Sequence, residues 1–228
     1  MTELIIKPTM FNLPQLTDEI ILFFNLQDFY LFRSIYGGSK VKSFGPAKRF
    51  SIELNHTVKT VLGGMIGAPL SMIILENAIA SGAKKVCAFG STGYLGLEQR
   101  EIGDIVVPAF GKDETGMTND YGADHQAEFL FKNPFDILPC QGIVSVNSFY
   151  RLSKDKVKTY RQKKIELIDM EATPMSYVAA EFGCDYFPVF VISDQIDKNY
   201  QWYNGTKSEK YKTGVENGMR MITNDNFF

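Results

Sequence analysis

Short apolar runs and longer apolar stripes alternate along the chain, and the two patterns predict different elements. Runs with the length of buried strands lie at residues 20–24, 49–54, 58–62, 84–90, 103–108, 142–147, 166–170 and 189–193. Helical patterns lie at residues 28–35, 70–81 and 174–182, and a terminal helix with a polar end lies within residues 208–228. Strands that alternate with helices predict an α/β fold.

Segments rich in glycine or polar residues separate these elements. Residues 63–71 (GGMIGAPLS) predict a glycine-rich turn that runs into a helix, and residues 90–96 (GSTGYLG) predict a tight loop of small residues after the strand at 84–90. Residues 111–126 are polar and predict a long surface loop of the kind that covers active sites. Residues 154–162 predict a charged, exposed segment.

Two acids stand at the ends of strand-like runs. Glu171 lies near the end of residues 166–172 (ELIDMEA), and Asp194 ends residues 189–194 (VFVISD). Ligands bind at the carboxyl ends of strands in α/β sheets, so two acids that leave two strands with one helix between them can converge on one small molecule. The alternative is that Glu171 only begins a helix and Asp194 only caps a turn. Together with the segments above, the pattern favours one shared active site.

Composition and charge narrow the classes of protein. The chain of 228 residues is 45% hydrophobic, which suffices for one domain over residues 1–228. A net charge of -2 without a basic stripe argues against a nucleic-acid partner. The apolar runs are far shorter than the roughly 18 residues that span a bilayer. Cys87, Cys140 and Cys184 lack CxxC spacing, so we expect a cytoplasmic protein without disulfides, metal or membrane contact.

Six short motifs follow one another in a specific order. They are the glycine-rich turn with Gly67 and its helix through Glu76, then GSTG at 90–93, GDIVVP at 103–108, SFY at 148–150, DMEA at 169–172 and SD at 193–194. In this order they resemble the superfamily of nucleoside phosphorylases and nucleosidases, which contains purine nucleoside phosphorylase, uridine phosphorylase and methylthioadenosine nucleosidase. The resemblance implies a single three-layer α/β/α domain with a central mixed, largely parallel sheet.

The resemblance also implies a reaction, the cleavage of the N-glycosidic bond of a purine nucleoside or a related nucleoside through a positively charged sugar. In that reaction Glu171 would hold the sugar hydroxyls, with Met170 packed against the sugar. Asp194, which follows Ser193, would be the general acid for the departing purine. Phe149 would stack on the base. The alternative for Met170 and Phe149 is a place in the core.

The nucleophile site departs from the phosphorylases, which hold phosphate with two arginines. Ala88 stands in place of one arginine, and residues 24–28 (FNLQD) replace the loop that carries the other. Nucleosidases activate water with an N-terminal glutamate, which makes Asp28 the hypothetical water activator; the alternative is a favourable partner of a helix dipole. Hydrolysis is therefore slightly favoured over phosphorolysis. The remaining donors, which would hold an anion weakly, are Ser91, Thr92 and Gly93.

Two further departures concern the sugar side of the expected site. Met65 replaces a small glycine of the family pattern, which would narrow the space for the sugar. Pro174 replaces a helix-forming residue, which would shift the start of the helix to Thr173 and move Glu171.

Two classes of function remain open. The leading one is an enzyme that cleaves nucleosides, and the alternative is a catalytically weak protein that binds or stores nucleosides on the same fold. A dinucleotide-binding oxidoreductase is disfavoured, because GSTGYLG is not GxGxxG. We expect no cofactor, although inorganic phosphate is a possible co-substrate. Family members form dimers, trimers or hexamers, so a homo-oligomer is expected, and neither His56 nor His125 can be assigned to the site.

Overall fold

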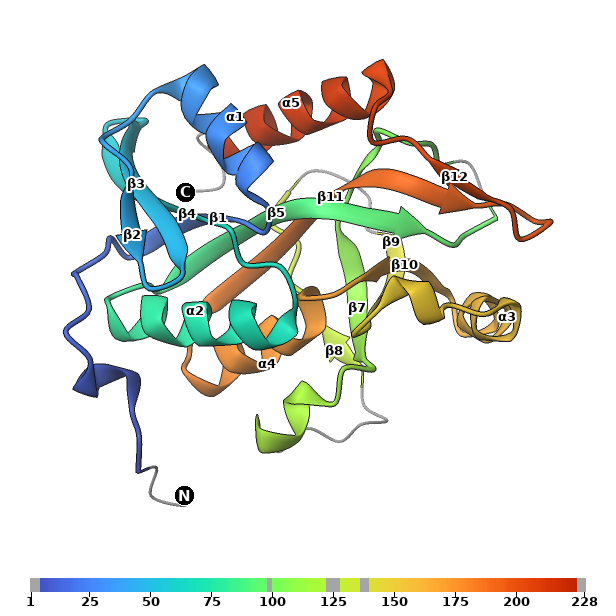
Figure 1. The fold of residues 1–228 in the computed structure, drawn as a ribbon, viewed down its shortest axis with the longest axis horizontal. Coiled ribbons are helices and arrows are strands. Elements are labelled where there is room, and N and C mark those ends of the chain that lie inside the picture. The colour runs from blue at the N-terminus through green and yellow to red at the C-terminus, as the bar shows by residue number, and fades with distance from the viewer. Residues whose placement is uncertain (1–4, 98–99, 122–127, 136–139, 225–228) are drawn as a thin grey trace.

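A computed structural model of the protein describes residues 5–97, 100–121, 128–135 and 140–224. A twelve-stranded sheet runs through this part of the chain, with helices on both faces (Figure 1). Its strands are β1 (Glu19–Phe23), β2 (Lys42–Phe44), β3 (Ala47–Leu54), β4 (Thr57–Gly63), β5 (Lys85–Tyr94), β6 (Ile105–Val106), β7 (Pro108–Asp113), β8 (Phe129–Leu130), β9 (Cys140–Ser145), β10 (Ile165–Asp169), β11 (Asp185–Ile196) and β12 (Trp202–Asn204).

The sheet is mixed: parallel pairs lie on both sides of an antiparallel pair formed by β5 and β10. The strand order is β2-β3-β4-β1-β5-β10-β9-β7-β8, while β11 pairs with β5, β6 and β12. Strand β5 runs parallel to β1 and β11 but antiparallel to β10. The expected fold class, an α/β protein with a central mixed sheet, is therefore confirmed. The carboxyl ends of β5 and β11 lie side by side, and β10 ends close to them.

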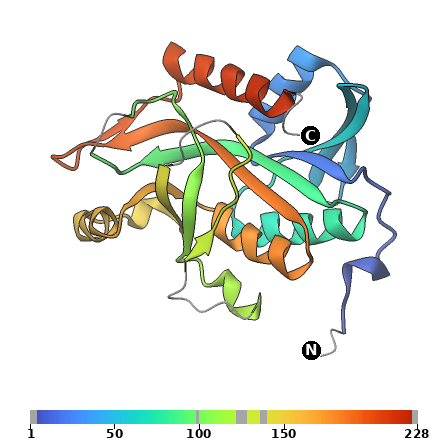
Figure 2. The same ribbon diagram turned by 180° about the vertical axis from the view of Figure 1, so that it is seen from behind.

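Two pairs of helices cover the two faces of the sheet. Figures 1 and 2 show α1 and α5 on one face and α2 and α4 on the other. Each face has its own core cluster, with Phe23, Phe89 and Met219 on the side of α5, and Ile74, Met175 and Phe190 on the side of α4. The helices are α1 (Leu26–Tyr36), α2 (Ala68–Ala80), α3 (Lys154–Gln162), α4 (Ala172–Glu181) and α5 (Glu209–Thr223), with short 3-10 helices η1 (Pro8–Met10), η2 (Met117–Tyr121) and η3 (Phe149–Arg151).

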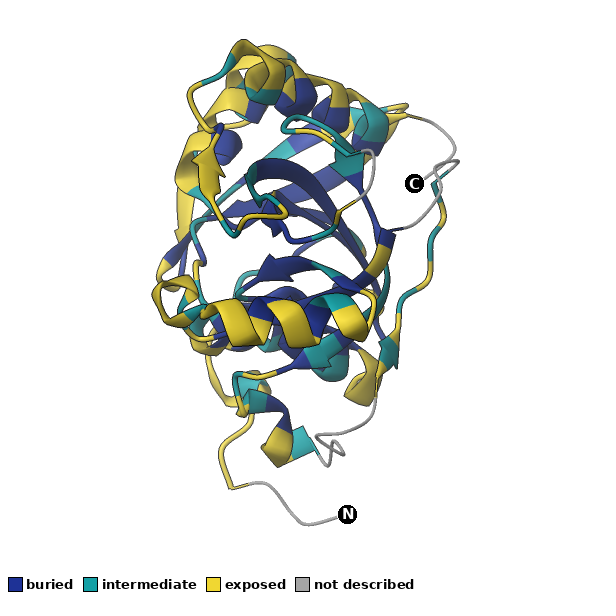
Figure 3. Ribbon diagram, turned by 90° about the vertical axis from the view of Figure 1, so that its right-hand side faces the viewer, coloured by how far each residue is buried: buried dark blue, intermediate teal, exposed yellow. Residues whose placement is uncertain are grey.

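The charged, exposed segment expected at residues 154–162 is helix α3. The side chain of Ser153 accepts the N–H of Lys156 and caps the helix. Val157 and Tyr160 are three residues apart and buried, whereas the rest of the surface of α3 is largely exposed (Figure 3). Two apolar anchors on one face are therefore enough to fix this polar helix against the sheet.

Two expected loops are also partly wrong. Residues 90–94 continue strand β5, because their backbone pairs with β11 on one side and, at Gly93 and Tyr94, with β10 on the other. Of the expected loop at 111–126, residues 111–113 belong to β7 and residues 117–121 form η2. Residues 122–126 of that loop, with His125, lie outside the described residues. No helix in the described ranges is both long and apolar enough to cross a bilayer.

Candidate active site

Asp169, the last residue of β10, organises the start of helix α4. One of its carboxylate oxygens, Oδ2, accepts the N–H groups of Glu171 at 3.0 Å and Ala172 at 2.6 Å, and the other accepts the hydroxyl of Ser145 at 2.6 Å. These bonds satisfy N–H groups that have no partner within the helix. The sequence pattern predicted a helix from Pro174 with Thr173 as its cap, but the helix begins at Ala172, and Asp169 rather than Thr173 accepts the first N–H groups.

Pro174 fits into the first turn of α4 without breaking the helix. It is the third residue of α4, where a missing N–H costs nothing because the first turn has no intrahelical acceptors. Glu171 is 7% exposed and accepts the N–H of Gly67 at 2.6 Å and of Met170 at 3.2 Å. Burial, and then the neighbouring charge of Asp169, raise the pKa of Glu171 to about 8.

Asp194 is held from two sides near the end of β11. Its Oδ1 accepts the hydroxyl of Ser193 at 2.6 Å, and its Oδ2 accepts the indole N–H of Trp202 at 2.9 Å. Gly93 faces this carboxylate across the sheet, and a Cβ there would lie 3.1 Å from Oδ2 of Asp194. The small residue that the sequence suggested as a loop position is thus a strand residue that makes room for an acid.

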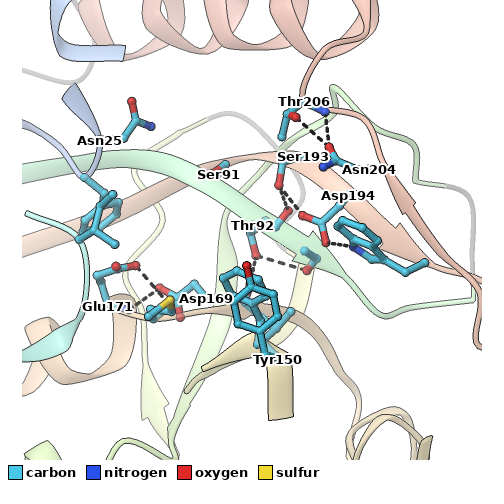
Figure 4. A pocket seen from close by; sticks show the side chains of 17 residues that line it. Asn25, Ser91, Thr92, Tyr150, Asp169, Glu171, Ser193, Asp194, Asn204 and Thr206 are labelled. Carbon is cyan, nitrogen blue, oxygen red and sulfur yellow. Dashed lines mark hydrogen bonds between the residues drawn. The ribbon is translucent and has the colours of Figure 1, made fainter. Parts of the chain in front are cut away.

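Glu171 and Asp194 face the same cavity, whose volume is about 410 Å³, within the usual range for small-molecule sites. Figure 4 shows the two acids on opposite sides, with Thr92 between them. The cavity is lined by Phe24, Asn25, Ile66, Ser91, Thr92, Gly93, Phe149, Tyr150, Ile168, Asp169, Met170, Glu171, Ser193, Asp194, Trp202, Asn204 and Thr206.

Of the candidates named from the sequence, Asp28 and Gly67 do not line the cavity, and the others do. Gly67 instead donates its N–H to Glu171, so it positions the acid. Asp28 is 8% exposed and lies behind Asn25, whose amide group donates to it at 2.6 Å. Burial raises the pKa of Asp28, and the bond from Asn25 opposes this shift.

The expected narrowing by Met65 does not occur at the cavity wall. Met65 is fully buried in the core on the side of α2, and its neighbour Ile66 lines the cavity instead. The chain turns at Gly64 and Gly67, which both have φ of +90°, so that successive side chains of this turn point in different directions.

The charges around the cavity are of one sign. Asp169, Glu171 and Asp194 line it, and none of the described lining residues is lysine, arginine or histidine. Ala88, which stands where the phosphorylases carry an arginine, is fully buried in the sheet and does not reach the cavity. Ser91 and Thr92 are neutral donors, and the hydroxyl of Thr92 already donates to the carbonyl of Ile168 at 2.9 Å. A small dianion would therefore find little compensation for its charge in this cavity.

Several lining residues had no signal in the sequence pattern. Trp202, Asn204 and Thr206 come from the short strand β12 and the turn after it, in a stretch without the alternation of a buried strand. Tyr211 of α5 does not line the cavity but forms a side-chain hydrogen bond with Ser91, which does. Burial and the charges of Asp28 and Asp194 raise the pKa of Tyr211 to about 12, against the opposing effect of that hydrogen bond. A turn motif typical of a β-hairpin after β11 would have indicated Trp202, Asn204 and Thr206.

Comparisons with known proteins agree with this architecture. A family model described as the phosphorylase superfamily matches residues 142–222. Among solved structures, purine nucleoside phosphorylase from Toxoplasma gondii in complex with immucillin-H is 17% identical with a TM-score of 0.78, covering 92% of this chain and 90% of that one. Uridine phosphorylase from Vibrio fischeri ES114 is 16% identical with a TM-score of 0.74, covering 92% and 91%. A comparison with curated protein sequences gives no significant match.

The fold is that of purine nucleoside phosphorylase and uridine phosphorylase, and the phosphorylase-superfamily model matches the segment that carries most of the candidate site. The resemblance to the nucleoside phosphorylase and nucleosidase superfamily, indicated by the order of the sequence motifs, is confirmed. The matched segment includes β10, α4, β11 and β12, the elements that carry Glu171, Asp194 and Trp202.

Proposed function

We propose that the protein cleaves the N-glycosidic bond of a purine nucleoside, or of a closely related nucleoside, with water as the nucleophile. The observation that carries the proposal is the cavity itself, in which Glu171 and Asp194 face one another across a space that no described lysine, arginine or histidine lines. Two acids suit a reaction in which the sugar becomes positively charged and the base departs with the bonding electrons.

Each acid has a distinct task in this proposal. Glu171 accepts hydrogen bonds from the sugar hydroxyls, and these bonds favour its ionised form, which then stabilises the cationic ring. Asp194 gives a proton to the five-membered ring of the purine as the bond between the sugar and the base breaks. Phe149, which is 52% exposed at the cavity wall, offers its face to the base.

Water completes the reaction by adding to the carbon of the sugar that the nucleobase leaves. The proton of the water passes to a carboxylate of the protein that acts as general base. We propose Asp28 for this step, because its pKa is raised and because Asn25, its hydrogen-bond partner, lines the cavity. Asp28 itself does not line the cavity, so the proton passes to it through one bridging water. Asp28→Asn should lower kcat at least tenfold with little change in KM. The matched control is Asp18→Asn, which alters an exposed aspartate outside the cavity lining. An unchanged kcat in Asp28→Asn would remove this role.

The proposal is tested by chromatographic assay of free base from adenosine, inosine, guanosine, methylthioadenosine and uridine, each with and without phosphate. Release without phosphate, abolished in Glu171→Gln and in Asp194→Asn, is the expected result. Release only with phosphate, together with ribose phosphate as product, would overturn hydrolysis. The lack of cations at the cavity also favours a second candidate, a nucleoside-binding protein with weak turnover, which tight binding without base release would identify.

A further inference from the structure

We propose that Trp202 is a positioning residue for Asp194, a role that rests on the proposed cleavage of a nucleoside. The indole N–H of Trp202 donates to Oδ2 of Asp194 at 2.9 Å, while the hydroxyl of Ser193 donates to Oδ1 at 2.6 Å (Figure 4). Each carboxylate oxygen therefore carries one fixed donor. Two donors on opposite oxygens set the plane and the direction of the carboxylate.

The register of the β11–β12 hairpin explains why this tryptophan reaches the acid. Asp194 pairs with Asn204, and Ile196 pairs with Trp202. Alternate residues of a strand point to the same side, so Asp194 and Trp202 lie on one face as a diagonal pair. Diagonal neighbours in an antiparallel pair are within reach of a long aromatic side chain. The contact is thus built into the sheet.

Arg161 of helix α3 connects the β11–β12 hairpin to the rest of the protein. The guanidinium of Arg161 on α3 donates to the carbonyl oxygens of Leu95, Ile196 and Asp197 at 2.6, 2.8 and 2.9 Å. It also lies 5.2 Å from the ring centre of Tyr200, in the turn of the hairpin. These contacts hold the end of β11 and the turn that leads to Trp202 on β12, although the side chain of Trp202 is 59% exposed.

The hydrogen bond from Trp202 leaves Asp194 able to protonate the nucleobase. In its protonated form the carboxyl group still accepts one bond at each oxygen, and its own O–H is free to point towards the cavity. Trp202 lines the same cavity, and its ring forms part of the wall beside Asp194. A fixed acid contributes more to catalysis than one that must be ordered during the reaction. Trp202 therefore acts through Asp194, and the reacting proton belongs to Asp194.

A spectroscopic test addresses the contact alone. Trp202 is the only tryptophan of the chain, so the labelled protein gives one indole N–H resonance in a proton–nitrogen spectrum. Asp194→Ala should move this resonance, because the acceptor of the indole N–H is lost. Tyr203→Phe alters the adjacent residue, which does not line the cavity, and should leave the resonance in place. An unmoved resonance in Asp194→Ala would overturn the proposal.

A kinetic test addresses the role in proton transfer. Trp202→Phe keeps an aromatic ring but removes the donor, and it should lower kcat/KM for a purine nucleoside roughly ten- to a hundredfold. Cleavage of 4-nitrophenyl riboside should change little, because its leaving group departs without a proton. Equal losses with both substrates would indicate a merely structural role and overturn the proposal. Absence of any cleavage by the unmodified protein would overturn the proposed function, whereas the resonance test does not depend on turnover.

Discussion

The carboxylate of Asp169 accepts the backbone N–H of Glu171 at 3.0 Å, so that one buried acid holds another at the start of helix α4. The two side chains are 7% exposed each. Burial raises the pKa of Asp169 to about 6 and, together with the charge of Asp169, that of Glu171 to about 8. The folded pair therefore holds a proton more tightly than two carboxyl groups in water would.

Glu171→Gln should stabilise the protein while it abolishes turnover. The pKa of Glu171 rises from an ordinary 4.5 to about 8 on folding, so the folded state binds the proton more tightly than the unfolded state. The free energy of unfolding of the unmodified protein should consequently fall as the pH rises from about 4.5 to about 8. Glutamine does not ionise, so we expect the variant to be more stable by about 1 to 3 kcal/mol at pH 8.

Denaturant unfolding at pH 5 and at pH 8 measures this difference. The stability gap between Glu171→Gln and the unmodified protein should widen towards pH 8. The control is Glu216→Gln on α5, which changes an exposed glutamate and should give little gap at either pH. A gap of the same size at both values of pH would contradict the raised pKa of Glu171.

The sequence allowed prediction of the central strands and of the two acids, but not of what holds the acids. Glu171 and Asp194 follow apolar runs, and strand ends converge in an α/β sheet whatever the details of packing. The cap by Asp169 and the bond from Trp202 depend on the register between β11 and β12 and on the exact start of α4. Both contacts are local in the sequence, but they depend on backbone geometry that the pattern of apolar residues does not encode, and residues 195–206 lack the alternation of a buried strand.

Gly93→Ala should impair activity more than folding. The added Cβ would lie 3.1 Å from Oδ2 of Asp194 and 2.9 Å from Cγ2 of Ile168, so the side chains must give way. Because Oδ2 is the oxygen that Trp202 holds, a displaced Asp194 loses its orientation. We expect a loss in kcat/KM of at least tenfold and a loss in stability of about 1 to 3 kcal/mol, measured by steady-state kinetics and denaturant unfolding. Full activity would show that Asp194 tolerates a shift.

Phe149→Ala should weaken the binding of the base. The ring is 52% exposed at the cavity wall, so its removal leaves no cavity in the core. The substitution should therefore lower the affinity for the ligand and change the stability of the fold little. Stacking of a base on an aromatic ring contributes about 1 to 3 kcal/mol, which sets the expected rise in Kd by isothermal titration calorimetry. Phe11→Ala, with a ring 59% exposed outside the cavity lining, is the control. Equal affinity of the Phe149 variant and the unmodified protein would place Phe149 outside the base site.

Arg161→Ala should make the β11–β12 hairpin more mobile and thereby weaken the orientation of Asp194 by Trp202. The lost guanidinium no longer holds the carbonyl oxygens of Ile196 and Asp197, and a lysine cannot replace its fork of donors, so Arg161→Lys should restore little. We expect faster amide hydrogen exchange across residues 195–204, and a lower kcat/KM for purine nucleosides, because Trp202 then no longer fixes Asp194. Arg151→Ala, at an exposed arginine of η3, should change neither. If exchange accelerates while kcat/KM is unchanged, the hairpin does not position the acid during catalysis.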